Sequence, residues 1–467
     1  MNPALVWFRS DLRVRDNTSL VEAAAKGEGV IGVFTICPEQ WLEHDWAPVK
    51  VDLLLRSLRA LSAALSGLGI PLKILGVPRF RGVPAALAAL AEAEGCPAIY
   101  FSREYEWNEA RRDEAVRRRF ESEGREVHAC DDSVILWPGS IKTQQGGDYT
   151  VFTPFKRNWL QTLEELGEPA VLEVPPVQAK LAVESDPVPT EIEGFQGLTR
   201  EDLYPAGEEA VQARLASFAE ARIGDYASGR DFPGEPGTSI LSPYLALGVI
   251  SPRQCLAAAR ACAGEGSEVW VSELIWREFY RHLLVAFPDL SKGKNFRRKY
   301  DALPWEENES AFTAWCEGRT GYPIVDAGMR QLRATGWMHN RVRMIVAMFL
   351  TKHLLTDWRR GERFFMQHLV DGDLAANNGG WQWSASTGTD AQPYFRVFNP
   401  WLQSKRYDAK GDYIYAHVPE LRGVPARALH DPEKLRRALD QRESDYPAPV
   451  VEHAEARLRA IATFKEL

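Results

Sequence analysis

The sequence of 467 residues lacks the features of several large classes of protein. Its six cysteines are scattered without a Cys-x-x-Cys pair or a metal-ligand spacing, so we expect reduced thiols and no metal site. No apolar run approaches the length of a transmembrane helix. The first residues, MNPALVWFRSDLR, pass quickly into charge and do not follow the layout of a signal peptide. These absences predict a protein of the reducing cytoplasm with no membrane span.

Acidic residues outnumber basic ones, with 64 Asp and Glu against 56 Lys and Arg, which gives a formal net charge of −8. This argues against a nucleic-acid partner, but the charge is unevenly distributed. Residues 270–363 hold 16 Lys and Arg against 11 Asp and Glu, and residues 291–300 alone contain five basic side chains. A basic face on an acidic protein can bind phosphates, although a charge run is more often a solvated surface. The local charge therefore permits DNA as a partner.

Strands and helices alternate over residues 1–130. Apolar runs bounded by turn residues predict buried strands at 4–8, 30–36, 71–77 and 98–102. Helical spacing predicts helices at 51–68 and 83–95. Such alternation is typical of a parallel sheet covered on both faces. The first turn reads RSDLRVRDN instead of Gly-x-Gly-x-x-Gly, so we expect a Rossmann-like α/β domain without the dinucleotide fingerprint.

The rest of the chain divides into a connector and a helical domain. Residues 131–200 are rich in turns, Pro and acidic residues, and we interpret them as a long connector that crosses the surface between domains. Strand signals nearly vanish after residue 200, and helical periods dominate residues 201–467. The predicted fold class is therefore α/β plus all-α.

Two polar clusters follow predicted strands of the α/β domain, QWLEHDW at 40–46 and EYEWNEARRD at 104–113. Ligands of open α/β sheets bind beyond the carboxyl ends of the strands, where both clusters lie. Ordinary loop and helix-start chemistry explains them equally well.

The densest polar stretch is 371–400, with two glycines beside each other and two tryptophans. Asp373 is a good N-cap for a helix through LAANNGGWQW. On that helix Asp373, Asn377 and Trp381 recur every four residues and share one face. A carboxylate, an amide and an indole on one face indicate a large planar ligand. The alternative is a capped helix that carries a core tryptophan.

Three further patterns in the helical part indicate a ligand. Thr238, Ser239 and Ser242 precede a predicted helix, where hydroxyls suit a phosphate, although an ordinary N-cap looks the same. A second helix sets aromatic and acidic residues on one face, which is unusual for a core because a buried carboxylate is costly. Asn340 and Met344 share a face of a third helix. In the polar stretch 371–400, Asp371 is expected to pair with a basic residue such as Arg343. The helix with the mixed face carries Trp270, Glu273, Trp276 and Arg277.

Tryptophan is concentrated in one part of the chain, because nine of the 15 fall between residues 270 and 401. A row of indoles leading from a redox ligand would serve electron transfer. Core packing explains any single one of them.

Together these strings resemble the DNA photolyase/cryptochrome family, and specifically the class I cyclobutane pyrimidine dimer photolyases. The matching motifs occur in the same order along nearly the whole chain. They are LVWFRSDLRVRDN, DDSVILWPG, FTPFKRNW, SELIWREFYRHLL, TGYPIVDAGMRQLRATGWMHNRVRM and DGDLAANNGGWQWSASTGTDAQPYFRVFNP. The resemblance implies an α/β antenna domain at 1–130, a connector at 131–200 and a helical FAD-binding domain at 201–467.

The resemblance also assigns roles to residues. Those expected to bind FAD are Tyr226, Thr238, Ser239, Ile240, Leu241, Ser242, Trp270, Arg277, Arg343, Asp371, Gly372, Asp373 and Asn377. Those expected to line the lesion pocket are Glu273, Trp276, Asn340, Arg341, Met344 and Trp383. Those expected to contact DNA are Arg230, Glu273, Trp276, Arg277, Asn340, Arg341 and Gln403. The expected electron relay is Trp381, Trp358 and Trp305, and the expected folate antenna site is Trp41, His44, Asn108, Glu109 and Lys292.

The implied activity is light-driven repair of UV-damaged DNA by a monomer that needs no membrane and no obligate protein partner. The expected cofactors are FAD, active in its reduced form, and a methenyltetrahydrofolate antenna. Glu273 is expected to donate a hydrogen bond or a proton to the flipped-out dimer. Two positions depart from the family, since Ile240 stands where many relatives have a basic residue and Ser272 replaces a common Asn.

Three other functions stay open from the sequence. A cryptochrome-type photoreceptor is the nearest, although no long signalling tail follows the helical domain. A (6-4) photolyase typically shows His near Asn340 to Met344, which this chain does not. An unrelated flavin oxidoreductase would need a dinucleotide fingerprint or a substrate domain.

Overall fold

The computed structural model describes residues 2–442 and 444–467. The chain forms two compact units, and each unit is assembled from three separate segments of the sequence. The first unit comprises Met1–Gly224, Ser239–Ser291 and Val370–Ala375. The second comprises Asp225–Thr238, Lys292–Leu369 and Ala376–Leu467.

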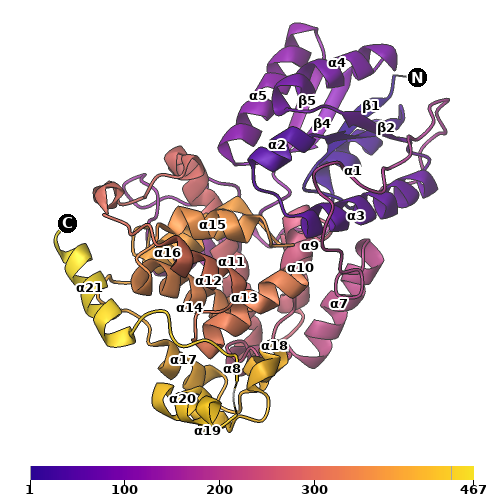
Figure 1. Cartoon of the computed structure of the whole chain (residues 1–467). Coiled ribbons are helices and arrows are strands. Elements are labelled where there is room, and N and C mark those ends of the chain that lie inside the picture. The colour runs from indigo at the N-terminus through magenta and orange to yellow at the C-terminus, as the bar shows by residue number, and fades with distance from the viewer. Residues whose placement is uncertain (1, 443) are drawn as a thin grey trace. The chain divides into compact units, whose positions relative to one another are not determined.

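A parallel sheet of five strands lies in the first unit, in the order β3-β2-β1-β4-β5 (Figure 1). The strands are β1 Ala4–Phe8, β2 Val30–Ile36, β3 Leu72–Gly76, β4 Ala98–Ser102 and β5 Glu126–Cys130. Every residue of β1, β2 and β4 is buried, because helices cover both faces and an alternating polar pattern is not needed. The four predicted strands are confirmed, and β5 is an addition whose short, half-exposed sequence EVHAC gave little signal.

Helices connect these strands in sequence. They are α1 Thr18–Ala25, α2 Pro38–Glu43, α3 Pro48–Gly67, α4 Val83–Ala93 and α5 Trp107–Ser122, with a 3-10 turn η1 at Phe80–Gly82. Helix α1 packs on β1, β4 and β5, α3 packs on β3, and α4 packs on α5. The two predicted helices correspond to α3 and α4, so the Rossmann-like arrangement is confirmed.

The segment predicted as an irregular connector contains a helix, α6 Phe152–Leu166. The interpretation of this stretch as turn-rich was wrong, because its apolar residues Phe152, Phe155, Trp159 and Leu163 recur at helical spacing and are buried. Residues 167–207, all of them described, form neither helix nor strand. They run along the sheet edge, where Asp186 accepts from the backbone N–H of Ile74 at 2.9 Å and Ser185 from that of Leu72 at 3.0 Å. Ser185 and Asp186 thus cover part of the edge strand β3.

The remaining chain is helical, as predicted, and the described residues after 200 include no strand. In the first unit the further helices are α7 Glu208–Ala221, α9 Ser242–Leu247, α10 Pro252–Arg260 and α11 Glu265–Ala286. The second unit begins with α8 Tyr226–Gly229, and η2 Pro288–Lys292 and α16 Leu374–Ala385 each start in one unit and end in the other. The others of the second unit are η3 Arg298–Ala302, α12 Glu309–Glu317, α13 Pro323–Thr335, α14 Asn340–Met348, the π-helix η4 Phe349–His353, α15 Trp358–Met366, α17 Pro400–Tyr407, α18 Asp412–His417, η5 Pro419–Leu421, α19 Ala426–Leu429, α20 Pro432–Asp440 and α21 His453–Lys465.

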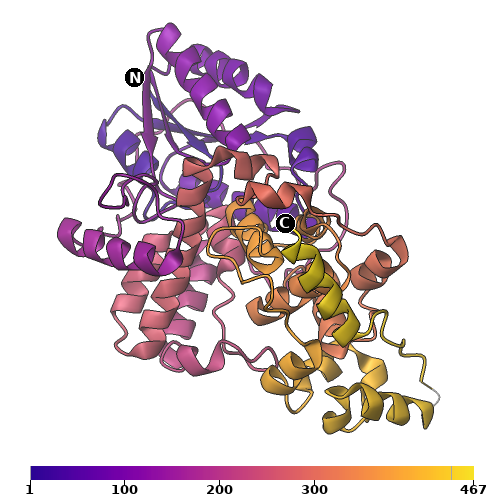
Figure 2. The same cartoon turned by 90° about the vertical axis from the view of Figure 1, so that its left-hand side faces the viewer.

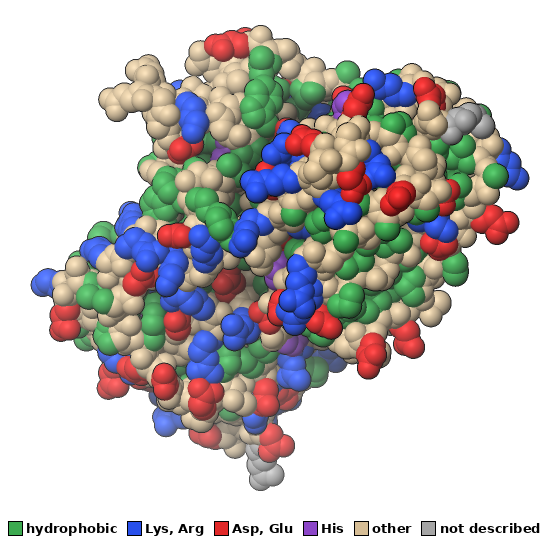
Figure 3. Space-filling view, turned by 90° about the horizontal axis from the view of Figure 1, so that it is seen from above, with side chains coloured by type: hydrophobic (Ala, Val, Ile, Leu, Met, Phe, Trp, Pro, Cys, Tyr) green, Lys and Arg blue, Asp and Glu red, His purple; other side chains and the backbone are tan. Residues whose placement is uncertain are grey.

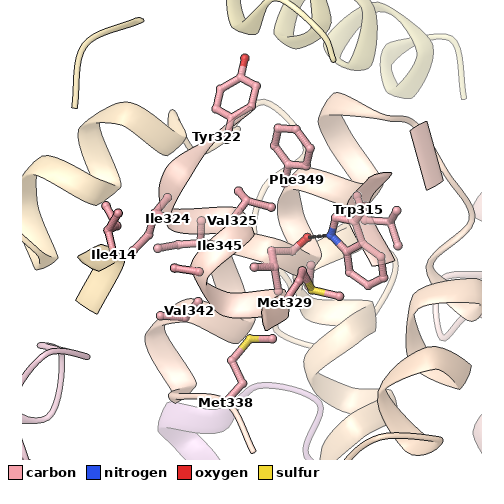
Figure 4. Packing of buried hydrophobic residues seen from close by; sticks show 14 of the residues in the cluster. Trp315, Tyr322, Ile324, Val325, Met329, Met338, Val342, Ile345, Phe349 and Ile414 are labelled. Carbon is pink, nitrogen blue, oxygen red and sulfur yellow. Dashed lines mark hydrogen bonds between the residues drawn. The ribbon is translucent and has the colours of Figure 1, made fainter. Parts of the chain in front are cut away.

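The core of the second unit is built on α13 and α14. Figure 4 shows Val325 and Met329 of α13 facing Val342 and Ile345 of α14, and the indole of Trp315 donates to the carbonyl of Val346 at 3.1 Å. The C-terminal helix α21, which is the yellow helix beside the C-terminus in Figure 2, packs on η4. Its Phe464 belongs to a smaller apolar cluster.

Close packing of Trp381 against Gly361 of α15 fixes part of this core. A Cβ on Gly361 would lie 2.1 Å from the Trp381 ring and 2.6 Å from Leu350, closer than atoms can approach. We expect Gly361→Ala to lower the free energy of unfolding by about 1–3 kcal/mol through overpacking, measured by urea denaturation. The matched control is Gly380→Ala in α16, whose Cβ would meet nothing within 4 Å. That change should instead stabilise the helix by roughly 0.5–1 kcal/mol, and equal effects of both would contradict the packing account.

Candidate functional site

Helix α11 is held within the first unit by a buried carboxylate. Glu278 accepts hydrogen bonds from the backbone N–H groups of Ile135 and of Leu136, the latter at 3.2 Å, and from the indole of Trp159 at 2.7 Å. Burial raises the pKa of Glu278, while the three donors oppose the rise. This carboxylate joins α11 to the segment after β5 and to α6.

The predicted site residues of α11 lie on its less buried side, except Trp270, which is buried against Phe218. Trp276 stacks on Phe152 of α6 with 3.6 Å between ring centroids, so its indole plane is fixed. Arg277 donates to the carbonyl of Ser133 at 2.5 Å and to that of Leu245 at 3.3 Å. Its burial, with the nearby charge of Arg281, lowers the pKa of Arg277 to about 10. Glu273 is half-buried on the same helix.

The turn at 370–375 belongs to the first unit and gathers three of the predicted residues. Asp371 accepts from the Ser242 hydroxyl at 2.6 Å, and Asp373 forms an ion pair with Arg281 at 2.5 Å. Lys50 of α3 donates to the carbonyl of Gly372 at 2.7 Å and lies over the Trp46 ring. Burial lowers the pKa of Lys50, against the charge of Asp373. The structure thus brings Ser242, Asp371, Gly372 and Asp373 together.

Sequence reasoning assigned no role to Lys50 or Arg281. Lys50 stands in the first turn of an amphipathic helix, where a lysine ordinarily points to solvent. Only the fold shows that this one is buried against a backbone carbonyl. The predicted pairing of Asp371 with Arg343 involves residues of different units and stays a prediction.

The predicted phosphate turn precedes α9, as expected. Within it Ile240 has a φ of 50°, a left-handed conformation that β-branched residues rarely adopt. Backbone strain of this kind costs of the order of 1–3 kcal/mol and persists where the surroundings fix it, often at binding sites. Leu241 is buried beneath the turn, while Thr238 and Ser239 are half-buried at the point where the chain passes between units. Ser272, the second departure from the family, accepts from Lys156 at 2.6 Å and donates to the carbonyl of Glu268.

In the second unit the predicted cationic residues share one neighbourhood. Arg341 at the start of α14 forms an ion pair with Asp231 at 2.8 Å and lies over the ring of Tyr407 of α17. Arg230, next to Asp231, lies over the ring of Tyr226. Asn340 is the first residue of α14, Gln403 is half-buried on α17, and Met344 is half-buried on α14. Arg343 donates to the carbonyl of Met338 at 2.8 Å.

Helix α16 begins directly after Asp373, as predicted. Asn377 donates to the carbonyl of Glu362 at 3.0 Å, and Trp381 packs on Gly361, so α16 lies along α15. Trp358 is the first residue of α15. Glu306, the neighbour of Trp305, donates its backbone N–H to Leu355, three residues before Trp358. The second unit therefore holds all three predicted relay tryptophans on adjoining segments, with Trp383 half-buried near the end of α16.

Buried ion pairs occupy the carboxyl edge of the sheet between β1 and β4, where nucleotides bind in many Rossmann folds. Arg9 pairs with Asp113 at 3.2 Å, and Arg112 pairs with Glu104 at 2.6 Å. Burial alone would raise the pKa of Glu104, but the charges of Arg112 and Arg9 outweigh it and hold the pKa at about 2. The missing dinucleotide fingerprint thus agrees with an edge that charged side chains already occupy.

The predicted antenna residues of the first unit lie together beside α2 and α5. His44 places Nδ1 3.1 Å from Glu109 and Nε2 3.0 Å from the amide nitrogen of Asn108. Burial alone would lower the pKa of His44, but the hydrogen bond and charge of Glu109 outweigh it and raise the pKa. Trp41 is buried and stacks on Trp46 with 4.9 Å between ring centroids. Lys292 belongs to the second unit, and its part in this site stays a prediction.

Comparison with known proteins decides the family. Residues 4–177 match the family model of DNA photolyase, and residues 270–466 match that of the FAD-binding domain of DNA photolyase. The chain is 45% identical to the deoxyribodipyrimidine photo-lyase of Vibrio cholerae over 99% of both chains. The chain belongs to the DNA photolyase family.

Solved structures of this family share the fold. A class III photolyase from Agrobacterium tumefaciens is 37% identical, with a TM-score of 0.89 over 100% of this chain and 98% of that one. A photolyase from Sulfolobus tokodaii, determined with two FAD molecules, is 33% identical, with a TM-score of 0.81 over 100% of both chains. Residues 270–466 of this photolyase-family chain are an FAD-binding domain. Among the residues described, no helix is long and apolar enough to cross a membrane.

The ion pair of His44 with Glu109 gives a test by titration. We expect Glu109→Gln to lower the pKa of His44. The pKa is measured by following the NMR signal of the imidazole proton as a function of pH. Because the folded pKa lies above the ordinary 6.5, the pair stabilises the fold fully below that pH, and this stability is lost as pH rises through the folded pKa. The variant should lose this pH dependence of the free energy of unfolding.

Glu43→Gln is the control, because Glu43 is a weaker source of charge near His44 and pairs instead with Arg79. An equal fall in the His44 pKa in both variants would show that Glu109 has no special part in the cluster.

Proposed function

We propose that this protein is a deoxyribodipyrimidine photo-lyase that repairs cyclobutane pyrimidine dimers in UV-damaged DNA under light. The observation that carries the proposal is the full-length similarity to a protein of that name, which spans every cluster described above. We further propose the class I subtype, with an antenna domain at 1–130, a connector at 131–200 and a catalytic domain at 201–467. Reduced FAD, when bound and excited, supplies the electron that opens the cyclobutane ring.

Several of the predicted residues fit FAD by their chemistry. The hydroxyls of Thr238, Ser239 and Ser242 suit phosphate oxygens. The strained residue Ile240 lies in the turn between them, and strain of this kind is often found at binding sites. The carboxylates of Asp371 and Asp373 are held by Ser242 and Arg281, so they are oriented before a ligand arrives. Further FAD contacts proposed from the family are Tyr226, Leu241, Trp270, Arg277, Arg343, Gly372 and Asn377.

The proposed lesion site places six residues around a flipped-out pyrimidine dimer. Trp276, fixed by stacking on Phe152, offers an aromatic face that excludes water. Glu273 donates a hydrogen bond or proton to a dimer carbonyl, and Asn340 satisfies the base edges. Met344 adapts to the shape of the ligand. Trp383 and Arg341 complete the set.

The proposed DNA contacts are Arg230, Arg277, Arg341 and Gln403, together with Glu273, Trp276 and Asn340 of the lesion site. Figure 3 shows Lys and Arg side chains interspersed with Asp and Glu over the visible surface, so the net charge of −8 does not give a uniformly negative face. Phosphate contacts by Arg make affinity fall as salt rises. We propose that the protein acts as a monomer in the cytosol, without an obligate protein partner.

The cluster of Trp41, His44, Asn108 and Glu109, with Lys292, is proposed to bind methenyltetrahydrofolate as an antenna. The ion pair of His44 and Glu109 gives a donor and an acceptor for the polar ring of a pterin. Chromatography of the cofactors released from the purified protein would distinguish folate from a second flavin.

The decisive measurement is repair of a thymine-dimer oligonucleotide in the dark and under near-UV or blue light. We expect repair only under light, and a loss of about tenfold or more for Glu273→Gln, equivalent to ~1.4 kcal/mol of lost transition-state stabilisation. Trp276→Ala should weaken binding of damaged DNA through lost aromatic contact. Glu268→Gln, an exposed position on the same helix, should repair at the wild-type rate.

Flavin absorption of the purified protein is measured first. Bound flavin that responds to light without any repair would favour a photoreceptor, and absence of flavin would overturn the proposal.

A further inference from the structure

The indole of Trp358 has a specific hydrogen-bond partner in the core of the second unit. Its Nε1–H donates to Oδ1 of Asn295 at 2.9 Å. Both side chains are buried, Trp358 at 0% and Asn295 at 2% exposure, so water does not compete for this bond. The amide oxygen of Asn295 is thus directed at one indole nitrogen.

Asp301 fixes which end of the Asn295 amide faces the indole. The Nδ2 group of Asn295 donates to Oδ1 of Asp301 at 2.9 Å, and a carboxylate accepts only from the nitrogen end. The oxygen end therefore points to Trp358. Asp301 is held in turn by Arg298 at 2.9 Å and by Arg359 at 3.6 Å.

Trp381, the neighbouring indole, has a contrasting environment. It is also buried, but its Nε1 has no hydrogen-bond acceptor among the residues that the structure describes. Its ring meets Gly361 and the edge of Phe365 at 4.9 Å between centroids. Gly361 lies one turn from Trp358 on α15, so the two indoles share a helix but not a polar environment.

This difference matters when an indole loses an electron. The resulting radical cation carries positive charge on the N–H group, and a hydrogen bond from a charged donor is roughly twice as strong as a neutral one. A carbonyl oxygen on that N–H therefore stabilises the cation, and an indole without an acceptor gains nothing comparable. The guanidinium of Arg359, 4.9 Å above the Trp358 ring, opposes this stabilisation, while Asp301 and Asp357 pair with it.

We propose that Asn295, oriented by Asp301, is a positioning residue that makes Trp358 a better electron donor than Trp381 while keeping the Trp358 proton in place. The inference rests on the electron relay of the proposed function. One electron passes from Trp358 to oxidised Trp381 after Trp381 has given one to bound oxidised flavin, and no bond forms or breaks. The amide oxygen is too weak a base to take the indole proton.

The retained proton keeps the relay moving. Trp358 regains its electron from Trp305, and an external thiol reductant refills Trp305. Had the proton left, the neutral radical would have to recover a proton before accepting the electron as an indole. Asn295 thus supplies stabilisation without proton loss, which neither an apolar side chain nor a carboxylate can do.

The test compares Asn295→Asp and Asn295→Leu in the FAD-loaded protein with oxidised flavin and a thiol. Transient absorption after a flash reports whether the indole radical is protonated, and steady illumination gives the rate of flavin reduction. In Asn295→Asp, the new carboxylate and that of Asp301 share one proton. One negative charge therefore remains, and it can accept the indole proton. We expect a deprotonated radical at Trp358 and reduction slowed about tenfold or more, whereas Asn295→Leu keeps the protonated radical and slows about threefold.

Asn308→Asp is the matched control, because Asn308 caps α12 on the surface and Asp is an equally good cap. It should reduce flavin within about twofold of wild type. Asp301→Asn changes an exposed position and removes the carboxylate that orients the Asn295 amide, without burying a charge. It should slow flavin reduction, and it keeps the test available where the Asn295 variants fold poorly.

Wild-type radical protonation and wild-type rates in Asn295→Asp or Asp301→Asn would overturn the inference, as would absence of light-driven flavin reduction in the wild type. Repair by chemically reduced protein is measured separately and should be unchanged in every variant. If the wild type repairs no dimers, yet its flavin reduction depends on Asn295, the proposed repair function fails while this inference stands.

Discussion

A carboxylate sealed away from water fixes the functional helix of the first unit. Glu278 meets three N–H donors from two separate segments, and each donor left without an acceptor would cost about 1–3 kcal/mol. The carboxylate and its three donors are therefore buried cooperatively, because each needs the others as hydrogen-bond partners. Since α11 also carries Glu273, Trp276 and Arg281, the geometry of their side chains depends on the buried Glu278.

The same reliance on buried charge appears in the sheet. At its carboxyl edge the pairs of Arg9 with Asp113 and of Arg112 with Glu104 take the place that a nucleotide occupies in other Rossmann folds. The polar cluster of His44, Asn108 and Glu109 stands beside α2 and α5 instead. We propose this cluster, and not the carboxyl edge between β1 and β4, as the place for a ligand in this sheet domain.

The sequence predicted the first four strands, the helical second half and the helix after Asp373, because apolar periodicity and caps are local properties. It also brought together Ser242, Asp371 and Asp373 through the family motifs. It did not predict β5 or α6, whose signals are short or mixed with turn residues. It could not identify Lys50 or Asn295 as buried partners of Gly372 and Trp358, because burial and pairing over such sequence distances are set only by the folded chain.

The way the chain passes between its units has a consequence for synthesis on the ribosome. The first unit lacks its last segment, Val370–Ala375, until long after residue 224 has emerged. At roughly 5–20 residues per second, these further 151 residues take on the order of 8–30 s, during which Lys50 lacks its partner Gly372. Neither unit is a continuous stretch of chain, so dividing the gene at one point would separate segments that must fold together. The first unit can therefore complete its fold only after residue 375 has been synthesised, when most of the second unit has already emerged.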